Sequence, residues 1–242
     1  MQQPAPENEK TGGVEALYPF LYTGQSDLAA VLQEVRRSTE AKAREIMALR
    51  DRLGNELASR LSACAYAMAG AFRAQGKLFA FGNGGSATDA QALAQLCLHP
   101  PVGEPLPAFA LTNDVAVVTA LANDVGFDVV FARQIAAFGK PGDIAVGIST
   151  SGNSANVIRA CDEAARRGLL TVGLAGYNGG AMAEAASIAH LFVVPSSSVH
   201  RIQEAQTTLY HVLWELTQEA LKGWQTIAEG AEHVPGNSRT DH

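Results

Sequence analysis

The sequence predicts an α/β fold: a three-layer, doubly wound parallel sheet of about five strands, with two N-terminal helices and a long C-terminal helix. Two observations carry this prediction. From residue 76 onward, short and continuously apolar runs alternate with amphipathic stretches, which is typical of parallel strands covered by helices on both faces. The chain also has 242 residues, 47% of them hydrophobic, which is enough to bury such a sheet.

Each element follows from the local pattern. Residues 26–53 and 56–74 place apolar side chains at helical spacing, and Gln75-Gly76 ends the second of these helices. Apolar runs predict the strands, which are 77–82, 107–111, 144–149, 170–175 and 190–194. Amphipathic stretches predict the later helices, which are 86–98, 115–122, 127–138, 154–167, 180–187 and 200–222.

The same pattern predicts how the chain is divided. We expect residues 1–25 to be a flexible arm, because they contain prolines and glycines and little periodicity. This arm carries an aromatic patch that could dock on the protein, formed by Tyr18, Phe20, Leu21 and Tyr22. Residues 26–224 are expected to form a single domain that includes the N-terminal helices, and residues 225–242 a flexible tail.

Composition excludes several classes of function. The net charge is −6 and the isoelectric point about 5.5, without a Lys/Arg run, so we expect no direct contact with nucleic acid. No apolar stretch is long enough to span a bilayer, and the first ten residues lack the apolar segment of a signal peptide. Cys64, Cys97 and Cys161 are scattered, as expected for buried thiols in a reducing cytoplasm.

Two loops rich in glycine and serine each follow a predicted strand and precede a predicted helix. The first loop is Gly82–Ser86, and the second loop is Ser149–Ser154. Such loops place amide groups and hydroxyls at a helix N-terminus, where the helix dipole favours an anion. Either loop alone could be a turn with a helix cap, but two on one sheet indicate a site for a phosphorylated small molecule.

The loops do not have the form of a nucleotide site. No Walker-type Gly-Lys-Ser/Thr occurs in the chain, and the first loop lacks the third glycine of a dinucleotide fingerprint. A neutral cradle with several donors is instead what a phosphate monoester needs.

The run from Gly147 to Ile158 resembles the signature of the sugar isomerase (SIS) domain. It is most similar to the phosphoheptose isomerases, which interconvert sedoheptulose 7-phosphate and a heptose phosphate. Residues 81–86, 122–127 and 201–204 agree with that family in order and spacing, and the resemblance covers about residues 28–221. It implies the SIS fold, a sugar-phosphate ligand, and a homotetramer with its sites at subunit boundaries.

The resemblance also implies the roles of individual residues. The family's phosphate loop falls on Ser149, Thr150, Ser151 and Ser154. Its sugar-contacting residues fall on Asn83, Gly84, Gly85, Asn123, Asp124 and Gln203, and Ser86 completes the first loop. A histidine that binds metal or transfers a proton in the family falls on His211, which shares a helix face with Gln203 and Thr207. As an alternative, His211 is an ordinary helix histidine at a subunit interface.

The chain departs from the family where the chemistry should lie. Active members carry a zinc-binding His, and one turn later a Glu that also serves as the base, but here these positions are Ala92 and Leu96. His99 lies on the face of Ala92 but about 10 Å farther along the helix axis. Gln203 and His211 remain as possible ligands, and a catalytic zinc usually needs three from His, Cys or carboxylate. The resemblance implies zinc, but these positions argue against it, and we therefore expect no tight zinc site.

Three hypotheses remain open. In the first, the chain binds a sugar phosphate, is catalytically impaired or inactive, and has a regulatory or scaffold role with a protein partner. In the second, it is an active isomerase of sedoheptulose 7-phosphate or a related ketose phosphate. Its acid/base pair is then rearranged around His211, with Asp89, Asp124, His99 or a residue of a neighbouring subunit as weaker candidates. In the third, it is the non-catalytic subunit of a hetero-oligomer with an active paralogue.

Overall fold

The computed structural model describes residues 28–232. Contacts divide the chain into two compact units, Met1–Met47 and Ala48–His242, and the whole sheet belongs to the second. In the described part of the first unit, exposed ion pairs one helical turn apart join Arg36 to Glu40 and Arg37 to Glu34. The aromatic patch predicted in the N-terminal arm lies outside the described residues.

Helix α2 (Leu28–Arg73) is one continuous helix, so the prediction of two N-terminal helices is wrong. The expected break lay at Gly54, a residue that costs about 1 kcal/mol in a helix interior relative to alanine. Leu53, Leu57 and Leu61 on either side of it are buried at helical spacing. This packing is worth more than the glycine costs, and the helix therefore continues through residue 54.

The five predicted strands are confirmed as one parallel sheet. They are β1 (Leu78–Gly82), β2 (Ala108–Ala110), β3 (Ile144–Ser149), β4 (Leu170–Gly176) and β5 (His190–Val194). Their order is β2-β1-β3-β4-β5, and every neighbouring pair is parallel. The direction of winding therefore reverses between β1 and β3, which is where open α/β sheets bind their ligands.

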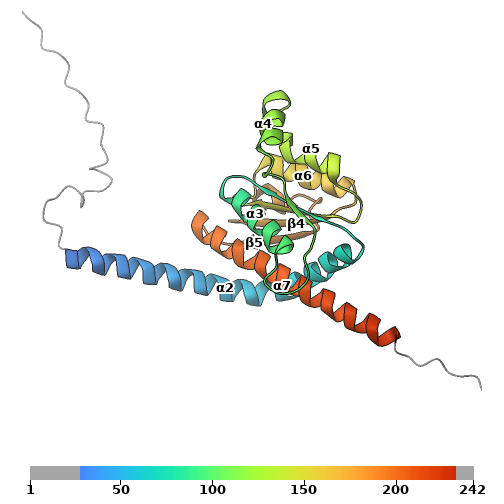
Figure 1. Cartoon of the computed structure of the whole chain (residues 1–242). Coiled ribbons are helices and arrows are strands. Elements are labelled where there is room, and N and C mark those ends of the chain that lie inside the picture. The colour runs from blue at the N-terminus through green and yellow to red at the C-terminus, as the bar shows by residue number, and fades with distance from the viewer. Residues whose placement is uncertain (1–27, 233–242) are drawn as a thin grey trace, which may run out of the picture. The chain divides into compact units, whose positions relative to one another are not determined.

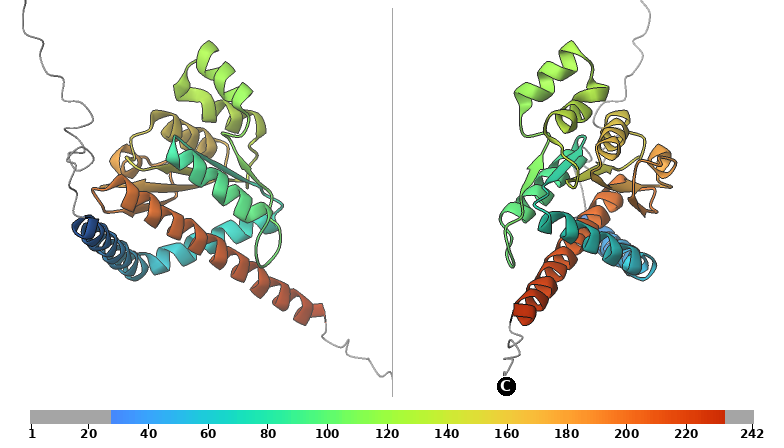
Figure 2. Two further views of the ribbon diagram at one scale, coloured as in Figure 1. Left: turned by 60° about the vertical axis from the view of Figure 1, so that its left-hand side comes forward. Right: turned by 90° about the vertical axis from the view of Figure 1, so that its right-hand side faces the viewer.

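Helices cover both faces of this sheet (Figure 1). Helices α5 (Val130–Phe138) and α6 (Ala155–Arg166) pack on one face, over a buried cluster that includes Phe79 and Phe81 of β1. Helices α3 (Gly85–Leu98) and α7 (Val199–Glu232) contact each other on the opposite face, as the two views of Figure 2 show. Helix α4 (Val115–Asp124) and the 3-10 turn η2 (Phe127–Val129) connect β2 to α5.

Two other expectations need correction. The predicted helix 180–187 is only a 3-10 turn, η3 (Gly180–Ala183), because Gly179 and Gly180 both adopt positive φ and start it in a non-helical conformation. Helix α7 continues past its predicted end at residue 222 to Glu232. Among residues 28–232, no helix combines the length and the apolar character needed to cross a membrane.

The three cysteines are free and buried, as expected. Burial raises the pKa of each thiol, of Cys64, Cys97 and Cys161, to about 12. At neutral pH these thiols are therefore protonated and behave as small apolar side chains.

Candidate functional site

The two Gly/Ser loops leave neighbouring strands at the point where the sheet reverses its winding. The first loop follows β1 and the second follows β3, and Gly82 pairs in register with Ile148 at the ends of these strands. Helix α3 starts in the first loop and α6 starts directly after the second. Neither helix has an acidic residue in its first turn, so no carboxylate there opposes an anion at the two N-termini.

Three hydroxyl groups meet in the second loop. The buried Ser149 Oγ lies 2.9 Å from Ser154 Oγ and 3.5 Å from Ser151 Oγ, and it accepts a hydrogen bond from the Gly152 amide at 3.2 Å. Ser154 caps α6 without a side-chain bond to the helix amides, and the amides of Ala155 and Asn156 are left available to a ligand. Thr150 is half-buried beside this cluster. The loop therefore offers converging hydroxyls and open amides, the donor set that a phosphate group accepts.

The turn η3 braces the second loop from behind. The carbonyl oxygen of Gly152 accepts from the Met182 amide at 2.9 Å, and Asn153 Oδ1 accepts from the Ala181 amide at 2.8 Å. Gly152 has a φ of +67°, and a Cβ there would lie 2.0 Å from the Gly179 carbonyl oxygen. Residues 179–182 thus fix the loop's shape, and no local sequence pattern marks this contribution.

The first loop meets helix α7 through Gln203. A Cβ on Gly85 would lie only 2.0 Å from Gln203 Nε2, so the amide side chain packs directly on the backbone of Gly85. Gly84 precedes it with a φ of +55°, and Ser86 is buried, with its amide bonded to the Asn83 carbonyl oxygen at 3.0 Å. The structure therefore brings these loop residues and Gln203 together.

A pair of asparagines joins the first loop to helix α6. Asn83 Nδ2 donates to Asn156 Oδ1 at 2.8 Å, and Asn156 Nδ2 donates back to Asn83 Oδ1 at 2.9 Å. Asn156 is buried, and sequence reasoning missed it. Its signal was an amide beside Val157 on the apolar face of an amphipathic helix, where a polar side chain needs a partner.

One turn beyond the first loop, a carboxylate is partly enclosed between α3 and α7. Thr207 Oγ1 donates to Asp89 Oδ1 at 3.4 Å, while Asp89 Oδ2 is buried without a hydrogen-bond partner among residues 28–232. Burial raises the pKa of Asp89, and the Thr207 hydrogen bond opposes this shift. Burial also raises the pKa of Tyr210, the Thr207 hydrogen bond opposes that rise, and the negative charge of Asp89 adds to it.

Beyond Asp89, the same face of α3 carries two apolar side chains. Ala92 and Leu96 stand seven and eleven residues after Gly85 and therefore share the helix face that begins beside Gln203. Ala92 is exposed and Leu96 is partly exposed. This face thus ends in a methyl and an isobutyl group at the positions where the resemblance implies a metal ligand and a base.

His211 is exposed on α7. Its Nδ1 lies 2.9 Å from the Thr207 carbonyl oxygen, so Nδ1 is the donor and Nε2 is left to accept a proton. The ring stacks on Tyr210 with 4.9 Å between ring centroids. His99 instead ends α3, exposed.

Asn123 and Asp124 lie at the end of α4, both exposed and bonded to each other at 2.8 Å. Within the described part of the chain, no hydrogen bond joins them to either loop. These two residues are therefore not tied to either loop by a hydrogen bond, and their contact with a sugar stays a prediction.

The donor set of the described residues does not fit a zinc ion. Within residues 28–232, no three His, Cys, Asp or Glu side chains are grouped so that they could hold a metal. Gln203 and His211 share a helix face, but Ala92 and Leu96 on α3 add no ligand, and Asp89 does not complete a group of three.

Known proteins place this arrangement in a family. The model of the family described as "SIS domain" matches residues 43–176, more than half of the chain. The phosphoheptose isomerase of Aquifex aeolicus is 51% identical over 146 residues, which are 59% of this chain and 75% of that protein. The phosphoheptose isomerase of Roseiflexus sp. is 40% identical over 193 residues, 79% of this chain and 93% of that protein.

Solved structures of phosphoheptose isomerases have a similar fold. The phosphoheptose isomerase of Neisseria gonorrhoeae is 36% identical with a TM-score of 0.71, covering 76% of this chain and 99% of that one. The enzyme of Francisella tularensis is 32% identical with a TM-score of 0.67, covering 81% of this chain and 100% of that one. The chain therefore belongs to the SIS-domain family and, within it, groups with the phosphoheptose isomerases.

Proposed function

We propose that this protein binds a phosphorylated sugar at its two Gly/Ser loops, is impaired in isomerase chemistry, and has a regulatory or scaffold role. The observation that carries the proposal is a contrast within one site. The hydroxyls of Ser149, Ser151 and Ser154 converge beside helix α6, whereas α3 presents Ala92 and Leu96 where active members carry a zinc-binding His and the base.

The binding half of the proposal rests on charge and hydrogen bonding. A phosphate dianion would accept hydrogen bonds from the serine hydroxyls and from the first amides of α6. Hydrogen bonds to a charged group contribute about 1.5–3 kcal/mol each, so a few of them support measurable affinity. Gln203, packed on Gly85, lies at the other loop, where the sugar hydroxyls of such a ligand would extend.

The chemical half rests on what isomerisation needs. An aldose and a ketose interconvert by moving a proton between adjacent carbons through an enediol, and this requires a positioned general base. Asp89 is hydrogen-bonded to Thr207 and has one enclosed oxygen, and Ala92 and Leu96 cannot carry a proton. The zinc ion of active members does not fit the side chains of the described residues, so we assign no step to it.

Calorimetry and a turnover assay test both halves. We expect sedoheptulose 7-phosphate to bind the purified protein without conversion, and Ser154→Ala to weaken binding about tenfold through one lost hydrogen bond to the phosphate. Ser59→Ala, an exposed serine on α2, is the matched control and should leave affinity unchanged. Absence of binding would remove the site, and robust turnover would remove the impairment.

A working isomerase with a rearranged acid/base pair is the second candidate. His211 favours it, because its free Nε2 sits two turns beyond Gln203 on the same face of α7. This candidate requires that His211→Ala abolish turnover while binding of the sugar phosphate survives. A wild-type protein that exchanges no ketose and aldose phosphates rules it out.

We also propose a cytoplasmic homotetramer. Between residues 48–73 of α2 and helix α7 lies a depression of about 380 Å³, lined largely by apolar side chains such as Leu61, Leu209 and Leu216. An apolar surface of this kind is typical of subunit contacts. The free, buried cysteines suit a reducing compartment. Light scattering of the protein alone tests the assembly, and purification from the native host tests for a paralogue in it.

A further inference from the structure

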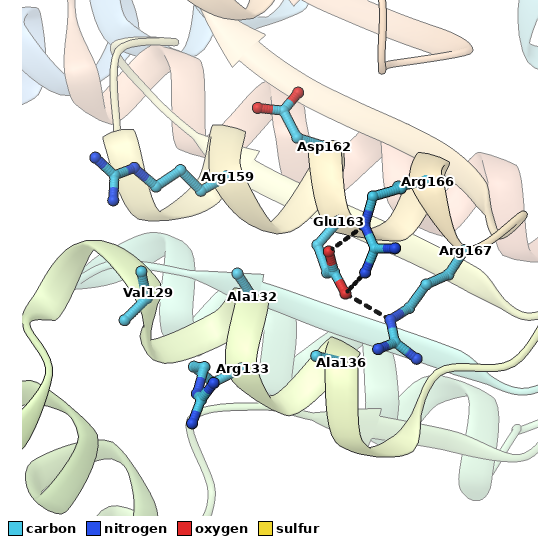
Figure 3. A pocket seen from close by; sticks show the side chains of 9 residues that line it. All are labelled: Val129, Ala132, Arg133, Ala136, Arg159, Asp162, Glu163, Arg166 and Arg167. Carbon is cyan, nitrogen blue, oxygen red and sulfur yellow. Dashed lines mark hydrogen bonds and ion pairs between the residues drawn. The ribbon is translucent and has the colours of Figure 1, made fainter.

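We propose that the groove between helices α5 and α6 is a second anion site, and that it binds a compact organic polyphosphate of the size of a nucleoside diphosphate. The groove lies apart from the Gly/Ser loops and is independent of the function proposed for them. Figure 3 shows it with the side chains that line it.

The groove has the dimensions of a small-molecule site. Its volume is about 460 Å³, within the range of roughly 300–1,000 Å³ that is usual for ligand pockets. Ala132 and Ala136 stand one turn apart on α5, and their small side chains leave a flat apolar floor.

Its walls carry an excess of positive charge. Four arginines and two carboxylates line it, although the chain as a whole has a net charge of −6. Arg166 and Arg167 both donate to Glu163, at 2.6 and 2.5 Å to the same oxygen. These hydrogen bonds lower the pKa of Glu163 to about 2, and the bond from Arg166 makes the larger contribution. Glu163 therefore stays ionised, but it neutralises only one of its two partners.

The other two arginines are poorly neutralised. The Arg133 side chain makes no hydrogen bond or ion pair with the described side chains, and that of Arg159 meets only the exposed Asp128, at 3.5 Å. An exposed contact of that length contributes little. Asp162, the second carboxylate, points away from α5 in Figure 3. Uncompensated guanidinium groups thus surround one hollow, which favours an anion there.

Guanidinium chemistry selects the ligand class. The planar fork of arginine forms paired hydrogen bonds to phosphate oxygens, and several such forks suit two adjacent phosphates better than one. The apolar floor suits a ligand that also has a ring. Adenosine diphosphate has both features and serves as the probe, with inorganic pyrophosphate as the probe for the phosphate part alone.

The groove is also distinct in place. Arg159 and Arg167 follow the loop residue Ser154 by five and thirteen residues. Along the axis of helix α6, their backbones therefore lie about 7 and 20 Å beyond Ser154. Ligands at the two sites would therefore not compete for the same atoms.

Calorimetry of the full-length protein tests the proposal. We expect adenosine diphosphate to bind, pyrophosphate to bind more weakly, and adenosine not to bind. Arg133→Ala should weaken binding of the diphosphate about tenfold, and Arg133→Ala with Arg159→Ala should weaken it further. Arg52→Ala removes an arginine of α2 that is paired with Glu56 and should change nothing.

Three results would overturn the assignment. They are no binding of adenosine diphosphate at millimolar concentration, binding that the Arg133 variant leaves intact, or displacement of the diphosphate by sedoheptulose 7-phosphate. The sugar-phosphate site has its own variant, Ser154→Ala, which should not affect diphosphate binding. Failure of one site is therefore distinguishable from failure of the other.

Discussion

Replacing Asn156 with alanine should destabilise the α/β unit, because Asn156 and Asn83 exchange two side-chain hydrogen bonds of 2.8 and 2.9 Å. Each bond is worth about 1 kcal/mol net, and the partner amide left without a bond adds a penalty of about 1 kcal/mol or more. The expected loss is therefore about 3 kcal/mol. In a domain of roughly 200 residues, that lowers the melting temperature by about 6–12 °C.

Thermal unfolding of Asn156→Ala, Asn83→Ala and the double variant, at one fixed protein concentration, measures this effect. Since both single variants break the same pair, the double variant should lose less than their sum, with a coupling energy of about 1–2 kcal/mol. Asn55→Ala is the control, because Asn55 is exposed and bonds only to the Asp51 carbonyl oxygen of its own helix. Additive losses would refute the reasoning, as would a loss for Asn156→Ala no larger than the control's.

Three further predictions each concern one side chain or backbone position. Gly85→Ala should weaken sugar-phosphate binding about tenfold, because the new methyl must displace Gln203; unchanged affinity in calorimetry would contradict this. Asp143→Ala should cost about 2–4 kcal/mol in chemical unfolding, since buried Asp143 accepts from two backbone amides and from the Lys77 ammonium; a cost below about 1 kcal/mol would speak against it. Asp89→Asn should raise the melting temperature at neutral pH. Burial raises the pKa of the Asp89 carboxyl in the folded state above its ordinary value of 3.8. The stability of the wild type therefore falls as the pH rises from 3.8 through this raised pKa. The advantage of the variant should accordingly vanish as the pH is lowered toward 3.8.

The sheet could be predicted because its information is local. Each strand is a short apolar run that ends at a Gly/Ser loop or another turn signal, and all five were located to within a residue or two. Two of the errors came from glycine. Gly54 resembled a helix end, but the packing of buried side chains on either side of it keeps α2 helical there. Gly179 and Gly180 instead limit residues 180–183 to a 3-10 turn, although the composition of this segment favours a helix.

The site was only partly accessible to sequence reasoning. The serine cradle follows from four hydroxyls in six residues, and the approach of Gln203 to Gly85 was implied by the family resemblance. The bond between Asn83 and Asn156 joins residues 73 positions apart, and no local pattern marks such a partner. The support of the second loop by residues 179–182 was missed for the same reason.

The central claim is that the site binds a sugar phosphate but does not catalyse proton transfer on it. Isomerisation through an enediol exchanges the hydrogen at the reacting carbon with solvent, even when the net conversion is small. The most direct measurement is therefore proton NMR of sedoheptulose 7-phosphate in D₂O, at saturating ligand with the purified protein. The account predicts line broadening of the bound sugar without loss of any carbon-bound proton signal. Loss of the signals at the carbon next to the carbonyl would contradict it.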